Sequence, residues 1–399
     1  MRTTEAPSVD HLKRRRHPAM LDLGTLGLPL LMDAGVAFGF VGFPLAAIRL
    51  GATPLHLGVL GCASPACFVL SCLLFGGLSD RWGRRPATIV GALAYALAFL
   101  GAYHAHSLTA LIAAAGAIGT AGGLYWPSLE ATIADAYGHG PLGRGLLLFN
   151  VGWTSGMMMG AMASGRLADA GSQLPFAAGA AVALAALPLL FFWPPRQVPS
   201  ATQEALPEEG KVAPHVVDHY LTLARIANFS AFFAVVSLRA LFPKLATDLG
   251  FSGGSIGMLI AITSLAQAVA FIPFAFWRRW QYQLGPFLVA EAMMVMALLG
   301  IARVSSAIAF GLLFAVVGAA CALTYTASLF YSLNRPADRG KMGALHEAIL
   351  GSGSVLGPIL GGTLAQHAGL RSPYLLAACV TLLVMALQLI LRKARAPRP

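Results

Sequence analysis

Long apolar stretches alternate with short polar connections from residue 22 to residue 391. A helix needs about 20 mainly apolar residues to cross the hydrocarbon core of a bilayer. Twelve stretches reach this length: 22–48, 55–78, 87–105, 107–134, 145–168, 174–194, 220–247, 254–277, 285–303, 305–332, 343–366 and 372–391. The pattern therefore predicts an all-α integral membrane protein with twelve transmembrane helices.

One long polar connection divides these helices six and six. It spans residues 195–218, PRQVPSATQEALPEEGKVAPHVVD, and its prolines and charges are typical of a flexible linker. The first apolar stretch is too long for the core of a signal peptide, so we expect it to remain as a helix. The predicted organisation is a basic N-terminus (1–18), a first six-helix bundle (19–194), the central linker (195–218), a second six-helix bundle (219–392) and a short tail (393–399).

The two halves repeat each other. Segment 43–58, FPLAAIRLGATPLHLG, matches segment 242–257, FPKLATDLGFSGGSIG, at an offset of 199 residues. A weaker match at an offset of 197 places Gly156, Gly160 and Gly165 on Gly353, Gly357 and Gly362. A parallel repeat of six helices predicts two pseudo-symmetric bundles. Transporters built in this way bind their substrate between the halves, near the membrane midplane.

Composition and charge support the membrane interpretation. Hydrophobic residues make up 57% of the chain and charged residues only 11%, against roughly 25% charged residues in a soluble domain. The net charge of +11 does not indicate nucleic-acid binding, because the 27 Lys and Arg residues fall in short groups between apolar stretches. The five Cys residues also lie in apolar stretches, without metal-ligand spacing.

The distribution of Lys and Arg predicts the orientation. With the N-terminus inside, twenty of these residues fall on the cytoplasmic side and two lie within the seventh helix. Five fall outside, namely Arg49, Arg166, Lys244, Arg303 and Arg371. Cytoplasmic loops carry the excess of positive charge in membrane proteins. We therefore expect both termini in the cytoplasm and the chain in the cell membrane.

A compact motif follows the second predicted helix. Residues 76–85 are GGLSDRWGRR, and the pattern GxLxDRxGRR is matched by Gly76, Leu78, Asp80, Arg81, Gly83, Arg84 and Arg85. The paired glycines allow close helix contact, and an aspartate can pair with arginine or with a helix N-terminus. Arg81, Arg84 and Arg85 would also help to set the topology, and this is compatible with pairing of Asp80 to an arginine or to a helix N-terminus.

This loop resembles the cytoplasmic signature of the major facilitator superfamily, and the resemblance extends from residue 19 to residue 392. It implies a solute transporter in which the loop joins the two bundles on the cytoplasmic side. It also implies that Asp135 and Arg144, between the fourth and fifth helices, take part in this cytoplasmic gate. A pair of surface charges would explain these two residues almost as well.

The eleventh helix contains GSVLGPILGG, in which Gly353, Gly357, Pro358, Gly361 and Gly362 allow close packing and a kink. The spacing resembles the antiporter motif that drug exporters of this superfamily carry in the fifth helix. Here the fifth helix has no such proline, and the first half of the fourth helix, LTALIAAAGAIGTAGG, has no arginine. These two departures do not favour a drug/proton antiporter.

Four acids lie well inside predicted spans, away from their first and last residues: Asp33, Glu130, Glu291 and Glu347. A charge there costs roughly 2.5–3.5 kcal/mol on insertion scales and usually faces a water-filled path or a partner. We predict that Glu347, assisted by His346, carries a coupling proton, with Asp33 as the second candidate. Pairing of Glu347 with an inner-face base such as Lys341 is the alternative. A role in the cytoplasmic gate or in interface packing is favoured for Glu130, and snorkelling toward the headgroups for Glu291.

Other polar and aromatic residues within the spans are candidates for the substrate cavity, although packing is the more frequent role of such aromatics. They are Tyr125, Trp126, Asn150, Trp153, Arg239, Gln267 and Tyr325. Arg239 suits an acid across the cavity, an anionic substrate group, or snorkelling toward the outer surface.

No GxxxxGK[ST] phosphate-binding loop occurs, so the energy for transport has to come from a gradient. We predict a monomeric secondary active transporter that moves a small solute by alternating access. Coupling to protons is expected, with import and export both open. No enzymatic activity, cofactor, metal or nucleic-acid partner is expected. The alternatives are a receptor or a membrane-embedded enzyme on the same fold, for which the sequence shows neither a soluble output domain nor a clustered catalytic set.

Overall fold

The computed structural model describes residues 17–75, 81–137, 142–193, 212–333 and 339–395, and these residues form twelve long helices. The first six are α2 (His17–Arg49), α3 (Pro54–Phe75), α5 (Arg84–Tyr103), α6 (Leu108–Tyr137), α7 (Leu142–Ala170) and α8 (Leu174–Phe192). The second six are α9 (Pro214–Asp248), α10 (Gly253–Phe276), α11 (Gly285–Ile301), α12 (Ala307–Leu333), α13 (Arg339–Ala368) and α14 (Ser372–Arg395). A single 3-10 turn, η1 (Arg278–Trp280), follows α10. The all-α prediction is confirmed.

Each predicted span coincides with one of these helices. Ten of them are long and apolar enough to cross a membrane by length and composition alone, and α11 is a shorter apolar helix of 17 residues. The remaining helix, α7, is diluted by glycine and polar residues. α9 begins at Pro214, within the segment assigned to the linker, and α14 continues to Arg395. Residues 195–211 of the predicted linker and most of both predicted termini lie outside the described residues.

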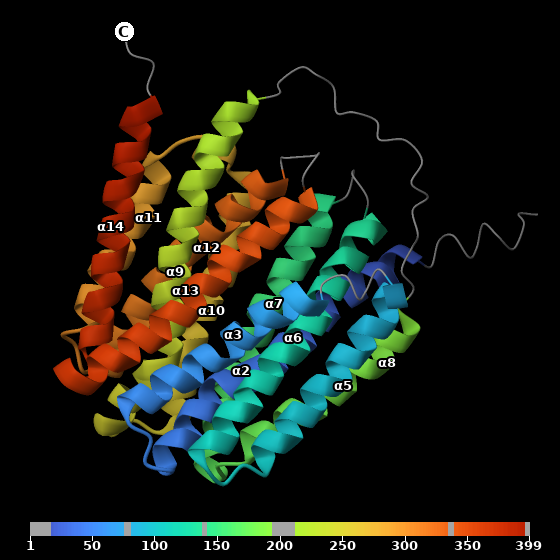
Figure 1. Ribbon diagram of the computed structural model, residues 1–399, viewed down its shortest axis with the longest axis vertical. Helices are drawn as coiled ribbons and strands as arrows, with labels where there is room; N and C mark the ends of the chain where they lie inside the picture. The colour runs from blue at the N-terminus through green and yellow to red at the C-terminus, as the bar shows by residue number, and fades with distance from the viewer. Residues whose placement is uncertain (1–16, 76–80, 138–141, 194–211, 334–338, 396–399) are drawn as a thin grey trace, which may run out of the picture.

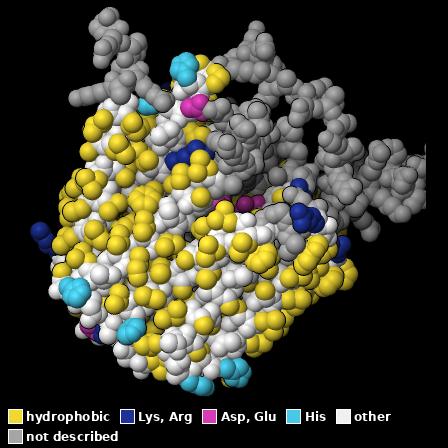
Figure 2. Space-filling model, in the orientation of Figure 1, with side chains coloured by type: hydrophobic (Ala, Val, Ile, Leu, Met, Phe, Trp, Pro, Cys, Tyr) yellow, Lys and Arg dark blue, Asp and Glu magenta, His cyan; other side chains and the backbone are white. Residues whose placement is uncertain are grey.

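Helices α2 to α8 form one bundle and helices α9 to α14 form the other, the blue-to-green and yellow-to-red halves of Figure 1. Phe99 and Phe176 lie in the core of the first bundle and Phe242 and Phe314 in that of the second, and both clusters of buried side chains continue across the interface between the bundles. Many large apolar side chains point outward instead, and they cover much of the face seen in Figure 2. Lipid tails are the solvent that suits such a surface.

The repeated glycines explain how the helices pack within each bundle. Gly156 of α7 lies against the backbone of Leu30 in α2, so closely that a Cβ atom would collide with it. Gly357 of α13 has the same relation to the backbone of Phe233 in α9. Small residues let helix backbones approach each other in a membrane. The sequence repeat therefore corresponds to the same close helix contact in both bundles.

The two bundles meet where α3 packs on α13 and α7 packs on α10. We call the end of the molecule that carries loops 50–53, 171–173, 249–252 and 369–371 the closed end, and the opposite end, where α2 begins and α14 ends, the open end. At the closed end Gly58 touches Gly362, and Gly165 touches Gly257. Among the described residues, hydrogen bonds and glycine contacts join the bundles in the region that extends from the closed end to the level of Trp153 in α7.

Candidate functional site

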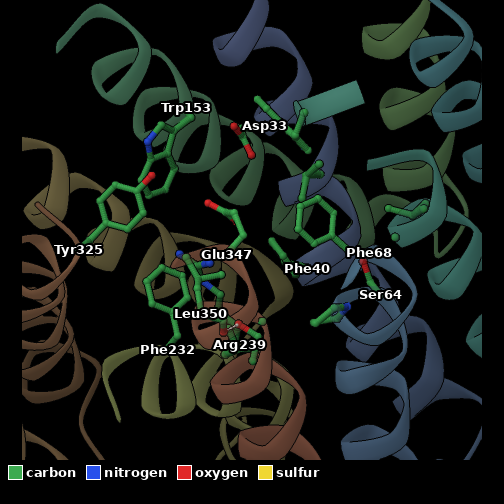
Figure 3. A pocket seen from close by; sticks show the side chains of 18 of the residues that line it. Asp33, Phe40, Ser64, Phe68, Trp153, Phe232, Arg239, Tyr325, Glu347 and Leu350 are labelled. Carbon is green, nitrogen blue, oxygen red and sulfur yellow. Dashed lines mark hydrogen bonds between the residues drawn. The ribbon is translucent and has the colours of Figure 1, made fainter. Parts of the chain in front are cut away.

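A cavity of about 220 Å³ lies between the two bundles. Its walls come from α2, α3, α5, α6 and α7 of the first bundle and from α9, α12 and α13 of the second. Figure 2 shows acidic side chains in a hollow near the middle of the molecule, and Figure 3 shows the lining side chains from close by. A mostly apolar cavity with a few charged groups is the usual form of a small-molecule site.

Three carboxyl groups line this cavity. Asp33 comes from the middle of α2, Glu130 from α6, and Glu347 from α13 of the other bundle. Glu130 is exposed, whereas Asp33 is half-buried and the Glu347 side chain is 33% exposed. The carboxyl groups of both bundles therefore face the same space.

Arg239 of α9 is the one base among the lining residues. It is only 7% exposed, its guanidinium lies 5.4 Å from the centre of the Phe40 ring, and its Nη2 reaches the Ser264 Oγ at a long 3.5 Å. Its Nε has no hydrogen-bond partner. Asp33 is close enough to attract it, but the described residues include no ion pair to Arg239. The cavity thus holds three acids and one partly satisfied base.

Aromatic rings from both bundles complete the walls. The ring of Trp153 in α7 lies 5.7 Å from Tyr325 and 6.1 Å from Phe271, both in the second bundle. Elsewhere on the wall the Trp126 indole donates to the Tyr95 hydroxyl at 3.1 Å. Such rings offer apolar faces that also attract cations.

The structure places six of the sequence-predicted residues on the cavity wall: Asp33, Trp126, Trp153, Arg239, Tyr325 and Glu347. Asn150 lies next to the wall, where its Oδ1 accepts a hydrogen bond from the Trp153 indole at 3.0 Å and so orients that ring. Tyr125 is fully buried behind Tyr95, and Gln267 is buried beside Cys321. These last two pack behind the wall.

His346 stands behind Glu347. It is 1% exposed, its Nδ1 is 2.7 Å from the Ser328 hydroxyl, and its Nε2 is 3.9 Å from the Glu347 Oε1. Consecutive residues of a helix point about 100° apart, which is why only Glu347 reaches the cavity. The side chain of Lys341, the alternative partner of Glu347, lies outside the described residues.

The structure places Glu130 and Glu291 in different surroundings. Glu130, for which we favour a role in the cytoplasmic gate or in interface packing, lies on the wall of the cavity between the bundles. The prediction that Glu291 snorkels is wrong, because it is 1% exposed and its Oε1 accepts a hydrogen bond from the Gln388 Nε2 at 3.1 Å. Sequence reasoning also missed several apolar wall residues, including Phe40, Phe68 and Phe232. An apolar residue in an apolar helix carries no signal of whether it faces lipid, core or cavity.

The predicted cytoplasmic gate motif is only partly described. Gly76, Leu78 and Asp80 lie outside the described residues, as does the side chain of Asp135. Arg81 is exposed, and Arg84 begins α5. Gly83 has a φ of 90°, which L side chains rarely adopt, and the Arg85 Nε donates to the Leu190 carbonyl at 3.0 Å. Arg144 pairs with Asp22 of α2 at 2.6 Å, a partner that the sequence did not predict. The gating role of the motif stays a prediction.

The glycine motif of α13 serves two contacts. Gly353 and Gly357 pack against α9 in the same bundle, whereas Pro358 and Gly362 pack against α3 of the first bundle. Gly361 lies near the Ser237 hydroxyl. The motif thus lies at the junction between the bundles.

Comparison with known proteins identifies the family. A sequence profile described as Major Facilitator Superfamily matches residues 25–223 and 224–399, one match for each half. The chain belongs to the major facilitator superfamily. It is thus a membrane transporter and not an enzyme, as the sequence predicted.

Two relatives are named multidrug resistance proteins. MdtG of Proteus mirabilis is 25% identical over 335 residues, which cover 80% of this chain and 82% of MdtG. MdtL of Shewanella oneidensis is 38% identical over 76 residues, and this match spans only 19% of either protein. This chain is therefore similar to proteins named for drug resistance, although its fourth helix lacks the arginine and its fifth helix lacks the proline of the drug-exporter pattern.

Two solved structures share the fold. A bacterial homologue of the human lysosomal transporter Spinster, described as inward-facing and unoccupied, superimposes with a TM-score of 0.74 at 14% identity, covering 96% of this chain and all of that one. The nucleoside transporter NupG gives 0.73 at 13% identity, covering 94% and 99%. These similarities confirm the arrangement of two six-helix bundles.

Proposed function

We propose that this transporter exports hydrophobic organic cations from the cytoplasm across the cell membrane in exchange for protons, working as a monomer. The observation that carries the proposal is the cavity between the bundles, where aromatic rings surround three carboxyl groups and one guanidinium. A lipophilic cation satisfies both features, since its rings pack on Trp153 and Tyr325 and its charge offsets the excess of carboxylate. The drug-resistance names of MdtG and MdtL support this substrate class.

The distribution of basic residues supports the orientation of the two ends. The five Lys and Arg residues assigned to the outside all lie at the closed end or in its loops: Arg49, Arg166, Lys244, Arg303 and Arg371. The positive-inside rule then assigns the open end to the cytoplasm. In this orientation the described conformation is inward-open, a state in which an exporter takes up its substrate and an importer releases it. The drug-resistance names of MdtG and MdtL favour export.

The facing carboxyl groups supply a mechanism of exchange. Glu130 and Glu347 come from different bundles, and their charges repel each other across the cavity. Either a proton or a bound organic cation relieves that repulsion, so the two compete for the same groups. Competition of this kind makes the release of a proton accompany the binding of a cation. Glu347 is the leading proton carrier, with the His346 ring 3.9 Å behind it and Asp33 as the second candidate.

The test uses purified protein in proteoliposomes with an imposed pH gradient and a fluorescent lipophilic cation. Wild type should accumulate the dye, and addition of dye should drive proton movement. Glu347→Gln should lose the dye-driven proton movement and keep dye counterflow, which needs no net proton transfer. Glu291→Gln is the matched control, because Glu291 is equally intramembrane but bonds to Gln388 away from the cavity.

The outcomes separate the parts of the proposal. Proton movement that persists at the wild-type ratio in Glu347→Gln would transfer the proton role to Asp33. Absence of dye transport by the wild-type protein, under a gradient of either sign, would refute the substrate class. Equal loss in Glu347→Gln and Glu291→Gln would show a general effect of removing buried acids.

A further inference from the structure

A carboxylate crosses the boundary between the bundles at the closed end. Asp169, the penultimate residue of α7, accepts a hydrogen bond from the Gly253 N–H at Oδ1 and another from the Gly254 N–H at Oδ2, each at 2.8 Å. These are the first two amides of α10 in the other bundle. The third, of Ser255, donates to the Ser252 Oγ at 3.2 Å within its own helix. Two of the free amides that begin α10 are therefore satisfied only across the bundle interface.

The repeat supplies a second contact of the same kind. Gln366 of α13 follows Asp169 by 197 residues, the offset that also relates Gly165 to Gly362. Its Oε1 accepts a hydrogen bond from the Leu55 N–H of α3 at 3.4 Å. Leu55 and Gly254 are related by the other repeat offset, 199 residues. Each bundle therefore caps a helix of the other, and the two contacts are equivalent under the pseudo-symmetry.

Close glycine contacts bring these caps within reach. Gly165 of α7 packs on Gly257 of α10, one turn from Asp169, and Gly362 of α13 packs on Gly58 of α3, one turn from Gln366. A side chain at any of the four positions would collide with the facing helix. The Arg49 guanidinium donates to the Ala168 carbonyl and so anchors the end of α7 that carries Asp169.

The two caps differ in strength because only one is charged. A carboxylate at a helix N-terminus is favoured by the helix dipole, and its charge-assisted hydrogen bonds are stronger than neutral ones. Gln366 makes one long neutral hydrogen bond. Separation of the bundles at the closed end would pull Asp169 away from both amides and leave them to water.

We propose that Asp169 and Gln366 form a crossed pair of helix caps that holds the closed end shut, with Asp169 supplying most of the bias toward this state. Under the proposed function this end is the outer gate, and the pair breaks and reforms once in each transport cycle. Asp169 does not touch the cavity and acts by positioning the bundles. The caps thus bias the access equilibrium without contacting the solute.

The test measures the separation of the closed end directly, without any solute. Spin labels are attached to His106→Cys, in the loop before α6, and Ala307→Cys, at the start of α12, both exposed and in different bundles. The protein sits in nanodiscs and its five native cysteines are replaced. Asp169→Asn should raise the ratio of the long-distance to the short-distance population about fivefold, because the amide keeps one acceptor oxygen but loses the charge and the second hydrogen bond.

Two further variants sharpen the test. Asp248→Asn is the matched control, because this carboxylate at the same end bonds to Lys244 of its own helix at 2.6 Å and should leave the distances unchanged. Gln366→Glu places a charge at the N-terminus of α3 and should shift the population the opposite way, toward the closed end. Gln366→Glu also tests the proposal if Asp169→Asn does not fold.

An Asp169→Asn distance distribution equal to that of wild type or Asp248→Asn would overturn the proposal, and so would an opening effect of Gln366→Glu. The result does not depend on the substrate. A shift of the distance distribution in Asp169→Asn, without dye transport by the wild-type protein, would support the caps and refute the proposed function. Dye transport by the wild-type protein without such a shift would refute the caps.

Discussion

Arg144 either takes part in the cytoplasmic gate or acts as a brace that stabilises the first bundle from within, and these two roles predict different effects of mutation. Its Nη2 donates to the Asp22 Oδ2 at 2.6 Å, and the same carboxylate accepts the Tyr137 hydroxyl at Oδ1, also at 2.6 Å. The three residues belong to α2, α6 and α7, all within the first bundle. The contacts therefore predict that breaking this cluster lowers the stability of one bundle and leaves the equilibrium between conformations unchanged.

The exposure of each partner sets the size of the effect. The Arg144 side chain is 68% exposed, and exposed ion pairs contribute about 0–1 kcal/mol. Tyr137 is 5% exposed, and a buried hydroxyl bound to a carboxylate contributes about 1.5–3 kcal/mol. We therefore expect Tyr137→Phe to lower the free energy of unfolding by about 2 kcal/mol and Arg144→Gln by less than about 1 kcal/mol.

A double-mutant cycle measures the coupling directly. The free energy of unfolding is determined in detergent micelles for Asp22→Ala, Tyr137→Phe and the double variant, and a coupling of about 1.5 kcal/mol is expected. Burial and the hydrogen bond to Asp22 raise the pKa of Tyr137 to about 12 from its usual 10. A raised pKa means that this stabilisation is complete below pH 10 and disappears as the pH rises toward 12.

Two results would refute the brace. One is an Arg144→Gln variant that costs more than Tyr137→Phe. The other is a shift of the closed-end distances by Arg144→Gln as large as that expected for Asp169→Asn. Either result would support the role in the cytoplasmic gate that the sequence predicted for Arg144.

Three further predictions concern topology, packing and the cavity. A reporter fused after Pro399 should be cytoplasmic and one inserted near Thr53 external, and the reverse activities would overturn the orientation. Gly156→Val should lower the free energy of unfolding by about 1–3 kcal/mol, because its side chain would collide with the α2 backbone, and unchanged denaturation would contradict the contact. Trp153→Ala should weaken binding of an aromatic cation roughly tenfold in a fluorescence titration, with Trp153→Phe closer to wild type. An affinity of Trp153→Ala equal to that of wild type would remove Trp153 from the site.

The number, order and grouping of the helices follow from the sequence alone. A membrane-spanning segment needs about 20 apolar residues whatever its neighbours are, so apolar length is a local property. The offsets of 199 and 197 residues are likewise visible without a structure, and they predicted two similar bundles. The excess of basic residues in alternate connections predicts an orientation for the same reason, because each connection is counted separately.

The tertiary structure decided which faces of these helices meet. Glu130 and Glu291 are both single acids in apolar helices, yet one lines the cavity and the other is buried against Gln388. Asp169 and Gln366 occupy equivalent positions in the repeat, but their role as caps emerges only because α7 meets α10 and α3 meets α13. In lipid nearly every position of a helix is apolar, so hydrophobic periodicity does not mark the buried face as it does in water. The direction of each side chain is therefore set by close packing between helices far apart in the chain.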